Sequence, residues 1–126
     1  MIKLKRAYDP AAADDGARFL VERLWPRGVK KTALQVHAWL KDVAPSSALR
    51  RWFAHDPKKW SEFRRRYFRE LGANAETLEP ILKAARRGRV TLVYSSHDIE
   101  HNNAVALKDY VEARLNQKRV PHTSST

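Results

Sequence analysis

The stretch 89–107 constrains the fold more than any other part of this sequence. It opens on the run 90–94, in which β-branched and aromatic residues dominate, as is typical of a buried strand. A dense polar cluster follows at 95–103, and an apolar pattern then predicts a helix. In open α/β folds, ligands bind beyond the carboxyl ends of strands and near helix amino termini. The stretch therefore predicts where a site lies, although it names no reaction.

Three further strands are predicted before this one, at 1–8, 18–24 and 36–43. The segment 18–24 is ambiguous between strand and helix, and the Trp25-Pro26 pair that follows favours the strand. Capping residues and apolar spacing predict the helices, which lie at 30–35, 46–53, 57–71, 78–87 and 104–115. The expected fold is one α/β domain over 1–116, with about four strands in a mostly parallel sheet, four or five helices and a flexible tail at 117–126.

Composition narrows the classes of function. The 126 residues include no cysteine, which excludes disulfides, thiolate metal sites and cysteine nucleophiles. The net charge of +11 favours an anionic partner, either a small molecule or nucleic acid, although a basic surface also serves solubility. No apolar run is long enough to span a membrane and no signal-peptide core is present, so we expect a cytoplasmic protein. The glycines stand singly, so no phosphate-cradling loop or cofactor is predicted.

Four motifs resemble those of a known family and occur in the same order as in that family. They are ERLWPRG at 22–28, WLKDVAPS at 39–46, WFAHDP at 52–57 and HNNA at 101–104. Together they resemble the bacterial YeaO-like family of uncharacterised proteins, and the resemblance covers most of residues 1–116. It implies a small cytosolic α/β protein without an assigned activity. His97 departs from the pattern, because Lys or Arg is expected before Asp98.

Asp98 and His101 are the candidate catalytic pair. A carboxylate can orient an imidazole for acid–base chemistry, as a hydrolase or nuclease-like enzyme would require. Alternatively, Asp98 caps the last helix and His101 lies in its first turn. His97 and His101 are four residues apart, but the spacing lacks the glutamate of known zinc helices, so no metal site is predicted.

Residues at the ends of the predicted strands are the candidate ligand-binding set. If the sheet is parallel, cations after the other strands converge on the polar cluster, where they can bind phosphate or carboxylate. The alternatives are that Arg23 pairs with Glu22 or Asp42, and that the asparagines tie the loop to the helix. The set is Arg23, Arg27, Lys41, Ser95, Ser96, His97, Asn102 and Asn103.

Residues 50–69 carry eight cations, most of which must project away from the apolar stripe of their helix. This basic helical face is either solvated or contacts a polyanion such as nucleic acid. It consists of Arg50, Arg51, Lys58, Lys59, Arg64, Arg65, Arg66 and Arg69. The identity of the ligand, the strand order and the oligomeric state do not follow from the sequence.

Overall fold

The computed structural model describes residues 2–119, which form an α/β fold as predicted. The strands are β1 (Ile2–Arg6), β2 (Ala17–Leu20), β3 (Ala38–Trp39) and β4 (Val90–Tyr94). The helices are α1 (Lys31–Leu34), α2 (Ser47–Phe53), α3 (Trp60–Ala73), α4 (Glu79–Arg87) and α5 (Asn103–Arg119). Short 3₁₀ turns are η1 (Ala13–Asp15), η2 (Lys41–Val43), η3 (Pro57–Lys59) and η4 (Ala75–Leu78).

The four strands form one sheet in the order β1-β4-β2-β3, and every neighbouring pair is parallel. The mostly parallel sheet predicted from the sequence is thus confirmed. The first three strands are shorter than predicted: β1 ends at Arg6, β2 ends at Leu20, and β3 ends at Trp39, shortly before η2 turns the chain. Helix α5 continues through Arg119, which places 117–119 of the predicted tail in a helix. The rest of that segment, 120–126, lies outside the described residues.

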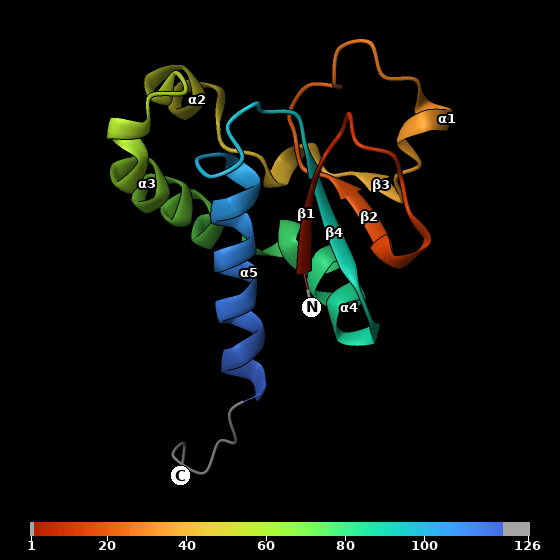
Figure 1. The fold of residues 1–126 in the computed structure, drawn as a ribbon. Coiled ribbons are helices and arrows are strands. Elements are labelled where there is room, and N and C mark those ends of the chain that lie inside the picture. The colour runs from red at the N-terminus through yellow and green to blue at the C-terminus, as the bar shows by residue number, and fades with distance from the viewer. Residues whose placement is uncertain (1, 120–126) are drawn as a thin grey trace, which may run out of the picture.

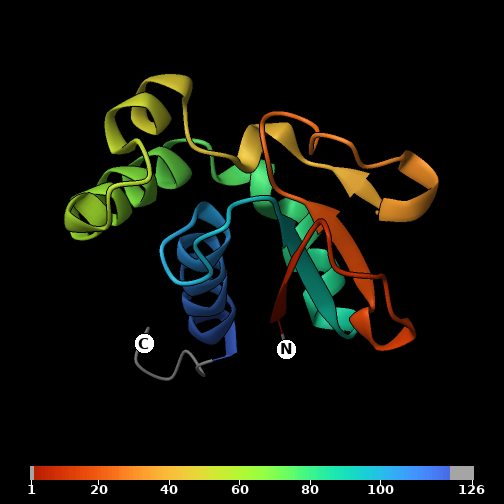
Figure 2. The same cartoon turned by 45° about the horizontal axis from the view of Figure 1, so that its top comes forward.

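Helices cover one face of the sheet. Figures 1 and 2 show α5 and α4 against this face, and α3 packs in turn on α5. The alternation of side chains along each strand supplies the apolar surface beneath them. The strand residues on this side are Ile2, Leu4, Phe19, Val90, Leu92 and Tyr94, and Val21, which follows β2, lies beside them. The core extends to the helices α2 and α3 through Phe53 and Phe63, whose stacked rings lie 4.3 Å apart.

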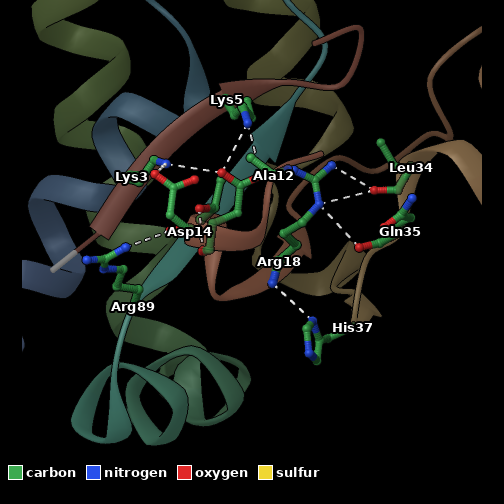
Figure 3. A network of polar contacts seen from close by, with 11 residues as sticks. Lys3, Lys5, Ala12, Asp14, Arg18, Leu34, Gln35, His37 and Arg89 are labelled. Carbon is green, nitrogen blue, oxygen red and sulfur yellow. Dashed lines mark hydrogen bonds and ion pairs between the residues drawn. The ribbon is translucent and has the colours of Figure 1, made fainter. Parts of the chain in front are cut away.

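The opposite face is covered by the segments on either side of β2, 7–16 and 21–37, and it contains a buried carboxylate (Figure 3). Lys3 and Lys5 point to this face because they alternate with the apolar residues of β1. Their Nζ atoms donate to Asp15 Oδ1 at 3.1 and 3.0 Å, and Arg18 Nη1 donates to Oδ2 at 2.6 Å. We call these four residues the Asp15 cluster. Its carboxylate is completely buried and has three cationic donors.

The Asp15 cluster also ties the sheet to its surroundings. Arg18 donates to the carbonyl oxygens of Leu34 at 2.7 Å and Gln35 at 3.2 Å, which are left without partners where α1 ends. Burial alone would raise the pKa of Asp15, but hydrogen bonds from the Ala12 amide and the three cations hold that pKa below its usual range. The folded state therefore stabilises the ionised carboxylate.

The first prediction concerns this carboxylate. Asp15→Asn should lower the free energy of unfolding by about 3–5 kcal/mol, because it leaves the buried Arg18 without its counter-ion. Asp14→Asn is the matched control, since Asp14 is exposed and lies 3.6 Å from Lys3, and it should cost less than about 1 kcal/mol. Urea denaturation of both variants measures the difference. Equal midpoints would show that the cluster does not hold the fold.

The same cluster predicts how stability depends on pH. The pKa of Asp15 is lower in the folded than in the unfolded chain, so its stabilisation is complete above the ordinary aspartate pKa of about 3.9. It disappears as the pH falls below that value and the folded carboxylate becomes protonated. Wild-type stability should therefore decline below about pH 4 more steeply than that of Asp15→Asn.

Candidate functional site

A pocket opens where β2 and β4 end, beside the first turn of α5. The two strands are parallel neighbours, so their carboxyl ends meet at one edge of the sheet (Figure 1). Helix α2 and the first turn of α3 contribute the facing wall. The cavity volume is about 160 Å³. We call it the strand-end pocket, and its lining residues are Glu22, Pro45, Arg50, Phe53, His55, Phe63, Ser95, Ser96, His101, Asn102 and Asn103.

Glu22 is the buried charged group of the strand-end pocket. It follows β2 by two residues and is only 9% exposed. Its Oε2 accepts a hydrogen bond of 3.0 Å from the backbone N–H of Ser95, which follows β4, so the carboxylate bridges the ends of two strands. Burial raises the pKa of Glu22, while the Ser95 N–H and the charge of Arg50 act in the opposite direction. Glu22 therefore has far less compensation than Asp15.

Asp98 holds His101 in a fixed orientation. Its Oδ1 accepts from the backbone N–H groups of Glu100 and His101, both at 2.9 Å, and its Oδ2 lies 3.1 Å from His101 Nδ1. These backbone N–H groups and the imidazole lower the pKa of Asp98. An ionised carboxylate only accepts hydrogen bonds, so Nδ1 carries the proton. The His101 ring also meets the indole of Trp60 edge-on at 5.4 Å.

The two asparagines fix the start of α5. Asn102 Oδ1 accepts from the Val105 N–H at 3.0 Å, so Asn102 and not Asp98 caps this helix. Its Nδ2 donates to the Asp98 carbonyl oxygen at 2.8 Å. Asn103 Nδ2 donates to the Val21 carbonyl oxygen at 2.7 Å and so joins α5 to the end of β2. Both side chains have the structural role considered from the sequence, while they also line the pocket.

Two groups that can carry positive charge reach the strand-end pocket from the α2 side. Arg50 belongs to α2, and His55 follows it in a turn where Ala54 and His55 both have positive φ values, 48° and 57°. This left-handed turn reverses the chain before α3. The aromatic rings of Phe53 and Phe63 complete the wall, so the pocket combines an apolar surface with polar groups.

Comparison with known proteins agrees with the four motifs. A family model described as the inactive DUF488-N3 subclade matches residues 1–126. The chain belongs to this family. It is 38% identical over 112 residues to the uncharacterised protein YeaO of Escherichia coli K12, which covers 89% of this chain and 97% of YeaO. It is 37% identical over 113 residues to the uncharacterised proteins Mb3100c of Mycobacterium bovis and Rv3073c of Mycobacterium tuberculosis H37Rv, with 90% of this chain and 95% of each relative covered. No solved structure matches the chain. The YeaO-like resemblance is confirmed.

The strand-end pocket brings together half of the residues expected at the site of this YeaO-like chain. They are Ser95, Ser96, His101, Asn102 and Asn103, all from the polar cluster that follows β4. Asp98 does not line the pocket but positions His101. Within residues 2–119, no three histidine, aspartate or glutamate side chains gather in a group that could hold a metal ion.

The three cations expected beside them lie elsewhere. Arg23 donates to the carbonyl oxygens of Ala44 and Pro45, at 3.2 and 3.3 Å, instead of pairing with a carboxylate. Lys41 lies over the Trp39 ring at 4.2 Å, and Arg27 is exposed in the loop after β2. These cations would meet the polar cluster only if β2 and β3 continued as far as the cations. Because β2 ends at Leu20 and β3 has two residues, the following chain turns away.

His97 is exposed and faces Arg6, with 3.4 Å between His97 Nδ1 and Arg6 Nη2. Arg6 Nε also donates to the Ser96 carbonyl oxygen at 2.9 Å. A guanidinium from β1 therefore stands beside the position where Lys or Arg is expected in the family.

Glu22, Arg50 and His55 were not among the site residues predicted from the sequence. Glu22 and His55 lie in two of the motifs that carry the family resemblance, so the motifs contained a usable signal. Arg50 had no such signal, because it is one of eight cations in its segment. Arg50 differs from the other cations of this segment because the fold places α2 against the ends of the strands.

The second prediction tests whether His101 is dispensable for folding. His101→Gln should cost no more than about 1 kcal/mol, because the side chain is partly exposed and precedes the helix. Phe63→Ala should cost about 3–5 kcal/mol, since its ring is 2% exposed in the core. Asp98→Ala should cost about 1 kcal/mol for its lost backbone hydrogen bonds. Thermal melts rank the three. A His101→Gln variant as unstable as Phe63→Ala would make the imidazole a structural residue.

Proposed function

We propose that this protein binds a small anion, bearing a carboxylate or a phosphate, in the strand-end pocket. The observation that supports this most is the gathering of Arg50, His55 and His101 around a cavity at the carboxyl ends of parallel strands. A guanidinium donates hydrogen bonds to both kinds of anion, and His101, whose Nδ1 proton goes to Asp98, donates to an anion from Nε2 when the ring is protonated. The net charge of +11 raises the local concentration of anions over the whole surface.

The size of the cavity limits what can be enclosed. A volume of about 160 Å³ is close to that of a protein cavity of roughly 150 Å³ that encloses benzene. The enclosed part of a ligand therefore has about six non-hydrogen atoms. Inorganic phosphate and three-carbon carboxylates satisfy this limit, whereas a nucleotide could insert only a phosphate group.

Binding is a better proposal than catalysis for this site. The Asp98–His101 pair has the arrangement of an oriented imidazole, as a hydrolase or nuclease-like enzyme would use. However, the matched subclade is described as inactive, and neither Ser95 nor Ser96 lies in the strained glycine-flanked turn that activates a serine. In a binding site, Asp98 holds the His101 imidazole in place for contact with the ligand.

The third prediction tests anion binding. In a ¹H–¹⁵N NMR titration, propionate and inorganic phosphate should each give saturable shifts at the amides of Ser95 and Asn103. Arg50→Gln should weaken this binding at least about tenfold, because a charged hydrogen bond contributes about 1.5–3 kcal/mol.

Arg51→Gln provides the matched control, since Arg51 is the adjacent exposed arginine and does not line the pocket. It should bind like the wild type. If neither anion gives saturable shifts, the proposal fails. If both substitutions weaken binding equally, the effect is that of overall charge and the pocket is not the site.

The alternative of nucleic-acid binding rests on the basic helical face, and several of its cations already have partners. Glu62 pairs with Arg65 and Arg66, Asp109 pairs with Arg64, and Lys59 donates to the Trp52 carbonyl oxygen. Outside the strand-end pocket, three cations of this face have neither an ion-pair nor a hydrogen-bond partner for their side chains within residues 2–119. They are Arg51, Lys58 and Arg69.

The fourth prediction uses this count. Six phosphate contacts would weaken binding about 10³-fold between 50 and 200 mM salt, whereas three would weaken it only about 40-fold. Anisotropy titrations of a labelled duplex at several salt concentrations measure the slope. We expect the smaller value, with micromolar or weaker affinity. A slope that corresponds to six contacts would show that the paired arginines exchange their carboxylates for phosphates.

A further inference from the structure

Glu22 offers an acceptor to the strand-end pocket that the anion proposed above does not use. Its Oε2 accepts from the Ser95 N–H, and no geometric hydrogen bond to Oε1 is found among the described residues, although the Ser95 hydroxyl is close enough to help lower the pKa of Glu22. No buried side-chain oxygen or nitrogen there lacks a partner, so Oε1 keeps access to the cavity that Glu22 lines. The buried carboxylate therefore presents one free oxygen to a bound molecule.

This free oxygen and the groups proposed to bind the anion line the same small cavity. Arg50 is near enough to affect the titration of Glu22, and both line the cavity together with His101. A ligand of about six non-hydrogen atoms in this space must contact both sides of it. An anion without a donor group would satisfy Arg50 and His101 but would leave Glu22 Oε1 unpaired in a small volume.

We propose that the ligand of the strand-end pocket carries a hydrogen-bond donor beside its anionic group, as a small amino acid or hydroxy acid does. The anion meets Arg50 and His101, and the ammonium or hydroxyl donates to Glu22 Oε1. An ammonium group fits best, because it also compensates the charge of a buried carboxylate. This inference rests on the anion site proposed above and specifies its ligand class.

The fifth prediction compares three ligands of nearly equal size by the same NMR titration. Alanine and lactate should bind at least about tenfold more tightly than propionate, because each adds one donor to a charged acceptor. If propionate binds as tightly as the other two, this inference fails while the anion site stands. If none of the three binds while inorganic phosphate does, this inference also fails and the anion site stands; if phosphate does not bind either, the anion site itself fails.

Glu22→Gln separates the two donor-bearing ligands. The Gln carbonyl oxygen must accept the Ser95 N–H, which turns the amide NH₂ toward the cavity in place of Oε1. An ammonium group cannot accept from that NH₂, so alanine should lose its advantage over propionate. A lactate hydroxyl can accept, so lactate should keep part of its advantage. Unchanged alanine binding would overturn the role of Glu22.

Glu79→Gln is the matched control, because it removes the same charge from an exposed position on α4 and should leave all three affinities unchanged. Thermal melts confirm that both variants fold. Glu22→Gln should melt no lower than the wild type at neutral pH, since it removes a charge that burial disfavours. Any loss of alanine binding then results from the change at the site and not from unfolding.

Discussion

The sheet depends on the ionised carboxylate of Asp15. Lys3 and Lys5 approach it from β1 and Arg18 from β2, while the Asp15 carbonyl oxygen accepts a 2.7 Å hydrogen bond from Thr91 of β4. One residue thus contacts three strands. The chain can pass this closely because Gly16 follows, with φ of 67°, where a Cβ would collide with the Arg89 carbonyl group. Parallel sheets are usually covered by helices on both faces, and here loops, the short helix α1 and the Asp15 cluster cover one face.

Two carboxylates lie at opposite ends of β2, and their surroundings give them different roles. Asp15 precedes the strand and has three cationic donors, which leave no capacity for a ligand. Glu22 follows the strand, has one backbone donor and lines a cavity. The distinction lies in the number of donors around each group, because both are buried. A saturated carboxylate stabilises the fold, whereas an unsaturated one beside a cavity is available for recognition.

The sequence predicted the parts of this molecule that depend on local patterns. The run from strand to polar cluster to helix gave β4, the start of α5 and five residues of the pocket, because these follow one another along the chain. Local patterns do not determine the ends of β2 and β3, which depend on the pairing of β2 with β4 and of β3 with β2, and so Arg23 and Lys41 do not lie where the patterns predict. Glu22 was weighed only as an ion-pair partner of Arg23, since nothing local distinguishes a buried carboxylate from a surface one. The position of Arg50 in the pocket follows only from the tertiary placement of α2, which no local pattern predicts.

The burial of Glu22 is energetically unfavourable, which supports a functional role for this residue. Because burial raises its pKa above the unfolded value, the stability associated with this carboxyl is greatest at low pH and declines as the pH rises through the folded-state pKa. At neutral pH the group thus opposes folding, unlike Asp15. An uncharged side chain of similar size would avoid this cost and could still accept from the Ser95 N–H. Proteins keep such destabilising groups where a site requires them. A ligand donor that reaches Oε1 supplies the compensation that the fold itself omits.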